Sequence, residues 1–93
     1  MNFMGEIIQR AVAGTLESSD VFVTLEPNDS GLELEIDSVV QNQFGEAIRK
    51  AAMDVLAEQG VENARVSIVD RGALDCVIRA RVETAVLRGK GVC

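Results

Sequence analysis

The segment GLELEIDSVVQNQFGEAIRKAAMDVLAEQG, residues 31–60, changes its hydrophobic period from two to about 3.6 partway along. Apolar and acidic side chains alternate strictly over residues 32–37, which predicts a strand with one buried face and one face in water. After Ser38 the apolar residues recur at helical spacing, and they are Phe44, Ala47, Ile48, Ala51, Ala52, Val55 and Leu56. The segment therefore predicts a strand followed by a helix over about residues 39–59, with the apolar stripe in the core.

Three local signals accompany this predicted helix. Ser38 and Gln41 have the spacing of a capping box at its start. Gly60 stands where a left-handed residue commonly ends a helix. Gly45 lies inside the helix, where glycine costs about 1 kcal/mol relative to alanine. We therefore expect Gly45 to pack closely against a neighbouring element.

Before this segment, two apolar and β-branched runs, residues 12–16 and 21–25, flank the polar stretch Glu17–Asp20. The pattern predicts a hairpin with a short polar loop, in which Val21, Val23 and Leu25 share one face. A second loop follows at residues 27–31, because proline, asparagine, aspartate and glycine all favour turns.

After the segment, residues 65–69 predict another strand, which runs parallel to residues 32–36 because a helix connects the two. Residues 73–87 fit either a helix or a strand, and the ambiguity is greatest over residues 74–83. Their length, their alanines and the Arg79 to Glu83 spacing favour a helix.

The predicted fold class is α+β, a two-layer sandwich of order βββαβα, with a mixed sheet and two helices on one face. With 93 residues the chain is long enough for one modest core, so residues 1–93 form a single domain. We expect flexible ends at residues 1–10 and 89–93.

The composition is that of an ordinary globular protein, with 47% apolar and 26% charged residues. Apolar runs are too short to cross a bilayer, and the first residues do not read as a secretory signal, so the predicted location is cytoplasmic. Cys76 and Cys93 are too isolated for a disulfide framework or a CxxC site. We predict no metal site.

Acidic residues dominate the first half of the chain. Between Ala11 and Ile48 there are eight Asp and Glu residues and no Lys or Arg. Such a surface repels nucleic acid and steers toward basic partner surfaces, or it simply keeps a sheet face solvated. Glu33, Glu35 and Asp37 share the wet face of a strand, where solvation is a commoner role than acid/base catalysis.

Two hydroxyls, Ser18 and Ser19, lie between Glu17 and Asp20 in the first predicted loop. A catalytic serine needs a base, and this chain has no histidine and only two lysines. A serine that another enzyme modifies needs only exposure, a pliable backbone and charges that help docking. The loop therefore predicts modification rather than catalysis.

Three blocks resemble the acyl carrier protein of citrate lyase, the citrate lyase gamma chain. They are AVAGTLESSDV (11–21), LEIDSVV (34–40) with QFG (43–45), and GALDCVIRARVE (72–83), and the match extends over roughly residues 11–88. The resemblance implies a non-catalytic carrier subunit whose cofactor is 2'-(5''-triphosphoribosyl)-3'-dephospho-CoA. The cofactor is covalently attached, as a phosphoribosyl-dephospho-coenzyme A arm in phosphodiester linkage to a serine. That serine directly follows Leu16–Glu17, so it is Ser18 here, with Ser19 as the fallback.

The resemblance also implies what the arm carries and what the chain meets. Its thiol holds an acetyl group that is exchanged for citrate, and the citryl thioester is then cleaved. The implied partners are the citrate lyase alpha subunit (acetyl-ACP:citrate transferase), the beta subunit (citryl-ACP lyase) and a prosthetic-group transferase, with no nucleic acid or membrane. Arg79 and Arg81 either contact phosphates of the arm or pair with neighbouring acids.

Four alternatives remain open on the sequence alone. A malonate decarboxylase-type carrier uses the same kind of arm. A four-helix phosphopantetheine carrier is disfavoured, because its Asp-Ser-Leu motif is absent and because the predicted strands do not suit a bundle. A non-carrier acidic adaptor or regulatory subunit would use the serines only as turn residues. An enzyme acting alone is the weakest alternative.

Overall fold

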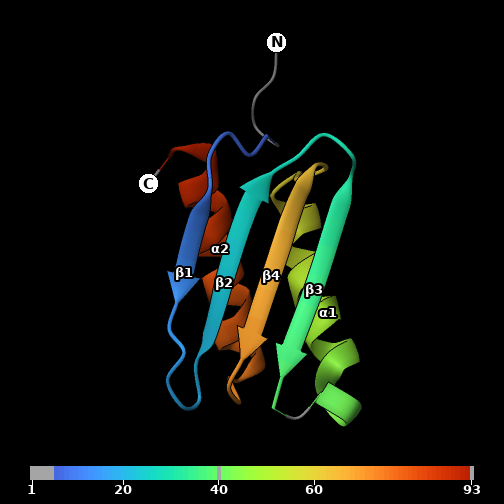
Figure 1. Cartoon of the computed structure of the whole chain (residues 1–93), viewed down its shortest axis with the longest axis vertical. Coiled ribbons are helices and arrows are strands. Elements are labelled where there is room, and N and C mark those ends of the chain that lie inside the picture. Colours follow the sequence, from blue (N-terminus) through green and yellow to red (C-terminus); the bar gives the residue numbers. More distant parts are fainter. Residues whose placement is uncertain (1–5, 40, 93) are drawn as a thin grey trace.

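Four strands and two helices follow one another in the predicted order βββαβα (Figure 1). The computed structural model describes residues 6–39 and 41–92, apart from the side chains of residues 41–44. The elements are β1 (Ala11–Gly14), β2 (Val21–Pro27), β3 (Leu32–Ser38), α1 (Gln41–Glu58), β4 (Ala64–Asp70) and α2 (Asp75–Lys90). The segment whose sequence fits either a helix or a strand is thus a helix, α2.

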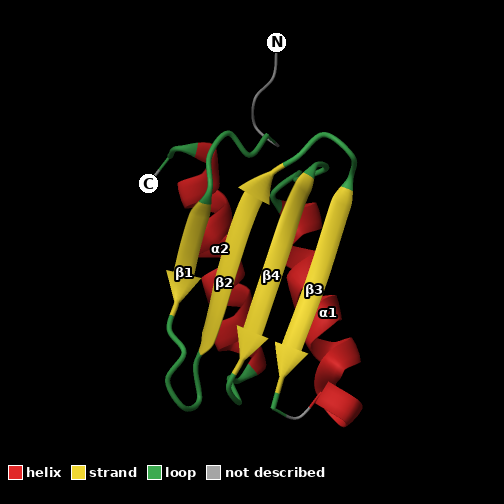
Figure 2. Ribbon diagram, viewed as in Figure 1, coloured by secondary structure: helices red, strands yellow, loops and turns green. Residues whose placement is uncertain are grey.

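The strands form one mixed sheet of order β1-β2-β4-β3 (Figure 2). β2 pairs antiparallel with both β1 and β4, whereas β3 pairs parallel with β4, so that Leu34 lies opposite Val66. The parallel pair joined through α1 confirms the prediction from the sequence. A four-stranded sheet also excludes a four-helix carrier.

Both helices cover the same face of the sheet, as Figure 1 shows, so the predicted two-layer sandwich is confirmed. Val21, Val23 and Leu25 of β2 all point into the core, as predicted, and are fully buried. The opposite face of β3 carries Glu33 and the other two predicted acidic residues in exposed positions. The largest fully buried side chains are Leu25, Leu56, Ile68, Val21, Val23, Val66, Val82 and Val86.

The two ends of α1 differ in how far they test the prediction. At the C-terminal end, Gly60 has a φ of 71°, its N–H donates to Ala57 O, and the Val61 N–H donates to Leu56 O. This left-handed cap confirms the prediction. At the other end, the pairing of Ser38 with Gln41 and the packing of Phe44 lie outside the described residues and side chains.

Among the described residues, Gly45 of α1 makes no close contact of the kind predicted, and a close contact at a glycine occurs in α2 instead. A Cβ on Gly45 would meet no described atom within 4 Å. A Cβ on Gly89 of α2 would lie 2.7 Å from Leu25 Cδ2 and 3.2 Å from Ile7 Cγ2. The missing side chain at Gly89 therefore lets α2 approach the sheet and the N-terminal segment.

Parts of both predicted flexible ends pack against the domain. Ile7 belongs to the core cluster, and the Ile8 N–H donates to Gly89 O at 2.9 Å. The Gln9 side chain donates to Arg88 O at 2.8 Å, and Lys90 Nζ donates to Gln59 O at 2.6 Å. These contacts join described residues near each end to the rest of the domain, and the flexibility of residues 1–10 and 89–93 stays a prediction.

Neither described helix is long and apolar enough to cross a membrane.

Candidate functional site

Ser18 and Ser19 lie in the loop between β1 and β2, and both side chains are exposed, as the sequence predicts. The loop projects from the same end of the sheet as the connection from β4 to α2 (Figure 1). Among the described residues, neither serine hydroxyl makes a hydrogen bond. Both hydroxyls are therefore accessible from solvent.

Gly14 sets the shape of the loop where β1 ends. Its φ is 91°, a left-handed conformation that side chains rarely adopt. A Cβ at this position would lie 1.8 Å from the carbonyl oxygen of Val21. Only glycine therefore lets the two arms of the hairpin approach, and the Thr15 N–H then donates to Val21 O at 3.2 Å.

Asp20 is the acceptor around which the loop is built. Its carboxylate accepts from Thr15 Oγ1 at 2.6 Å and from the Val21 N–H at 2.7 Å. It also accepts from Arg81 Nε at 3.2 Å and Arg81 Nη2 at 3.1 Å. These hydrogen bonds lower the pKa of Asp20 to about 2, and the bond from Thr15 contributes most, followed by those from Val21 and Arg81.

Backbone bonds complete the loop on its other side. The Ser19 N–H donates to Arg71 O at 2.8 Å, and the Arg71 N–H donates to Asp20 O at 2.9 Å. Ser19 has a φ of 66°, which is uncommon for a residue other than glycine. The backbone of Ser19 is thus tied to the neighbouring connection, while Ser18 makes no hydrogen bond among the described residues.

Asp20 does not activate the neighbouring serine hydroxyls. A carboxylate with four donors and a pKa of about 2 is a poor base for a serine hydroxyl. Asp20 is therefore not suited to take the proton from either serine hydroxyl. Within the described part of the chain, no three His, Cys, Asp or Glu side chains are grouped to hold a metal ion.

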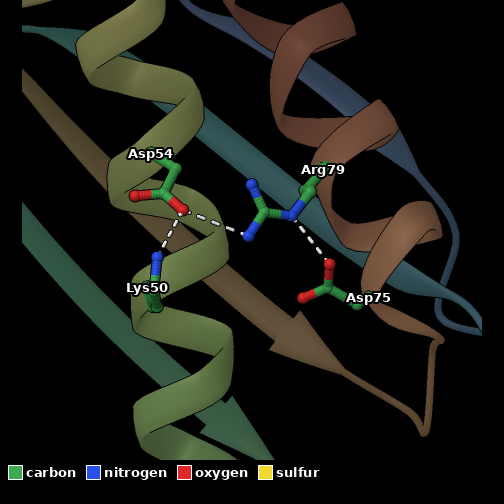
Figure 3. Close-up of polar contacts among 4 residues, drawn as sticks. All are labelled: Lys50, Asp54, Asp75 and Arg79. Carbon is green, nitrogen blue, oxygen red and sulfur yellow. Dashed lines mark hydrogen bonds and ion pairs between the residues drawn. The ribbon is translucent and has the colours of Figure 1, made fainter.

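Arg79 and Arg81, which the sequence leaves between two roles, both pair with acids. Arg79 Nε lies 2.7 Å from Asp75 and its Nη2 lies 3.1 Å from Asp54, which also binds Lys50 (Figure 3). The hydrogen bonds that Arg79 donates to Asp75 and, to a smaller extent, to Asp54 raise the pKa of Arg79. Arg79 therefore bridges α1 and α2 through Asp54 and Asp75, whereas the helical spacing also allowed a pair with Glu83.

Three residues of this site escape prediction from the sequence. Thr15 stands out only through its hydrogen bond to Asp20, which the sequence does not reveal. Arg81 reaches Asp20 across 61 positions of the chain. Arg71 lies in a turn whose place beside Ser19 depends on the pairing of β2 with β4.

Comparisons with known proteins match nearly the whole chain. The profile of the family Malonate decarboxylase delta subunit (MdcD) matches residues 8–89. A citrate lyase acyl carrier protein of Escherichia fergusonii is 57% identical over 84 residues, which are 89% of this chain and 87% of that protein. A citrate lyase acyl carrier protein of Vibrio cholerae serotype O1 is 56% identical over 84 residues, 89% of this chain and 86% of the relative.

A solved structure shares the fold. One chain in the crystal structure of a Pseudomonas malonate decarboxylase hetero-tetramer in complex with malonate superposes with a TM-score of 0.78 at 26% identity. The match covers 89% of this chain and 86% of that chain. The family profile over residues 8–89 includes the serine loop, the sheet, all of α1 and most of α2.

Proposed function

The chain belongs to the citrate lyase acyl carrier proteins, within the malonate decarboxylase delta subunit family, and we propose from this that it carries acyl groups on an arm attached to Ser18. The resemblance found in the sequence is confirmed by relatives at 57% and 56% identity. Its expected role is that of a carrier subunit without catalysis of its own.

The observation that supports attachment at Ser18 is an exposed hydroxyl on a loop with a fixed frame. A transferase must enclose its target residue, and loops held by a rigid scaffold meet that need. Ser18 makes no hydrogen bond among the described residues, so its hydroxyl is available. Ser19 is also exposed and is kept as the fallback, but its backbone is bound to Arg71 O.

The proposed cofactor donor is 2'-(5''-triphosphoribosyl)-3'-dephospho-CoA. Ser18 Oγ forms a bond to the first phosphorus of the donor's 5''-triphosphate, the one attached to the ribose. Pyrophosphate leaves, and the hydroxyl proton is released to a base of the transferase. Once attached, the arm supplies a thiol that holds acetyl and citryl thioesters. Tethering then raises the local concentration of the acyl group at partner active sites.

We propose three partners for this carrier. They are the citrate lyase alpha subunit, which exchanges acetyl for citrate, the beta subunit, which cleaves the citryl thioester, and the prosthetic-group transferase. The whole assembly is expected in the cytoplasm. The weak basicity of Asp20, with its pKa of about 2, is consistent with chemistry supplied from outside this chain.

A malonate decarboxylase-type carrier is the second candidate, supported by the family profile and by the fold match at a TM-score of 0.78. The identity of 57% to a citrate lyase carrier, against 26% to the malonate decarboxylase chain, favours the first candidate. Reconstitution separates them, because the loaded chain is expected to restore citrate cleavage with citrate lyase alpha and beta subunits and not malonate decarboxylation.

The attachment site is tested by loading the chain with donor and transferase and weighing its peptides by mass spectrometry. We expect the wild type and Ser19→Ala to gain the mass of the arm on the peptide containing residue 18. Ser18→Ala is expected to gain nothing and to leave the reconstituted lyase inactive. It should fold normally, because the exposed side chain makes no hydrogen bond among the described residues.

Loading of Ser18→Ala with loss of loading in Ser19→Ala would move the site by one residue. A wild-type chain that gains no mass with any matching transferase would support the acidic adaptor instead.

A further inference from the structure

We propose that the Arg71 guanidinium binds the phosphate group carried by the attachment serine, and this inference rests on the proposed attachment at Ser18. The phosphate is that of the donor during loading and of the phosphodiester afterwards. Arg71 is then a binding residue for the arm, distinct from Arg81, which braces the loop through Asp20.

The backbone places Arg71 beside the serines. Two hydrogen bonds, Ser19 N–H to Arg71 O at 2.8 Å and Arg71 N–H to Asp20 O at 2.9 Å, continue the pairing of β2 with β4 beyond Val21 and Asp70. Paired backbones lie about 5 Å apart, and arginine has one of the longest side chains. The guanidinium therefore has the reach to meet a group on the neighbouring Ser18.

Arg71 is also available, unlike most basic residues of this chain. Five of the nine basic residues form ion pairs, and two more donate to backbone carbonyls. The paired residues are Arg10, Lys50, Arg65, Arg79 and Arg81, and the other two are Arg88 and Lys90. Among the described residues this leaves Arg49 and Arg71, both exposed and without a polar side-chain partner.

The charges around Ser18 explain why a free cation at this position matters. Glu17 and Asp20 flank the serines, and the arm would add a phosphodiester with one negative charge beside them. Arg81 is already engaged by Asp20, with Nη2 3.1 Å from Oδ2. Arg71 is thus the available positive charge next to the loop, and its planar fork of N–H donors matches two phosphate oxygens.

The first test compares loading kinetics of the full chain in Arg71→Gln, Arg71→Lys and Arg49→Gln. Both positions are exposed, and thermal unfolding checks that each of the three variants is folded. We expect the transferase KM for Arg71→Gln to rise about tenfold, as for one lost charge-assisted contact, and for Arg71→Lys by roughly two- to threefold. Arg49→Gln, which removes the same charge from α1, is expected to load like the wild type.

The second test does not depend on activity. The side-chain Nε–Hε signals of Arg71 and Arg49 are compared by NMR in the unloaded and the loaded chain. We expect the Arg71 signal to shift on loading and to return toward its unloaded position as salt screens the contact. The Arg49 signal is expected to stay in place. A loading defect without the NMR shift assigns the contact to the donor alone and overturns the contact with the attached phosphodiester.

Two results overturn the whole proposal. One is that Arg71→Gln loads with wild-type kinetics and that, in the wild-type chain, the Arg71 Nε–Hε signal does not shift on loading. The other is an equal loss in Arg49→Gln and Arg71→Gln, which would reflect net charge and no defined contact. Both results leave the proposed function intact, because the wild type still gains the arm on Ser18. A wild-type chain that is never loaded overturns the proposed function itself.

Discussion

Asp20 shows how one side chain orders a loop that is otherwise short, polar and exposed. Its carboxylate joins Thr15, Val21 and Arg81, which come from two sides of the hairpin and from α2. Because Thr15 donates to Asp20, its Oγ1 can also accept from the Glu17 N–H at 3.2 Å. The residues before and after the serines are therefore fixed, while the serine hydroxyls face solvent.

The pKa of Asp20 gives a direct test of this frame. The pKa falls from the ordinary 3.8 to about 2 because the folded loop stabilises the charged carboxylate. The stabilisation is thus complete above about pH 4 and is lost as the pH falls through 2. We expect the Asp20 carboxyl carbon signal and the Val21 amide signal in NMR to titrate together with a midpoint near 2.

In Asp20→Asn the Val21 amide should lose this transition, which makes the variant the matched control. A midpoint close to 3.8 in the wild type would show that the bonds to Asp20 do not persist in solution.

The internal glycines of the two helices differ in how closely other residues pack against them. Gly45 of α1 has no described neighbour within 4 Å of a built Cβ, whereas Gly89 of α2 lies against Leu25 and Ile7. A glycine in a helix is costly wherever it is not needed for close packing. The helical pattern assigns Gly45 to a helix and ends before Gly89, which the structure places in α2, so it does not reveal which glycine contacts the sheet.

The pair Gly45→Ala and Gly89→Ala is expected to change stability in opposite directions. Gly45→Ala should raise the free energy of unfolding by about 0.5–1 kcal/mol, because alanine restricts the unfolded chain and favours the helix. Gly89→Ala should lower it by about 1–3 kcal/mol, because its Cβ would overlap Leu25 Cδ2 at 2.7 Å. Urea unfolding of both variants measures the difference, and a destabilised Gly45→Ala would mean that α1 does pack closely there.

At the scale of the whole molecule, acidic residues of the first half of the chain form ion pairs with basic residues of the second half. Asp20 pairs with Arg81, and Glu33 of β3 pairs with Arg65 of β4. The charge asymmetry along the sequence is therefore partly neutralised in space. The ends meet as well, because the segment around Ile7 packs beside the last turn of α2.

Neighbouring isoleucines test whether the N-terminal segment completes the core. Ile7 is 6% exposed and Ile8 is 59% exposed. Ile7→Ala should lower the free energy of unfolding by about 2–4 kcal/mol, because it leaves a cavity beside Gly89 and Leu25. Ile8→Ala should change it by no more than about 0.5 kcal/mol. Chemical denaturation gives both values, and equal small effects would place Ile7 outside the core.

The sequence by itself determined the order of strands and helices, the exposed serine loop and the cap at Gly60. These features depend on the hydrophobic period and on backbone preferences of neighbouring residues, which can be read locally. Only the tertiary structure decided that Arg81 meets Asp20, that Arg71 lies beside Ser19, and that Gly89 takes the close contact. Each of these depends on an approach in space between segments far apart in the chain, to which no local pattern is sensitive.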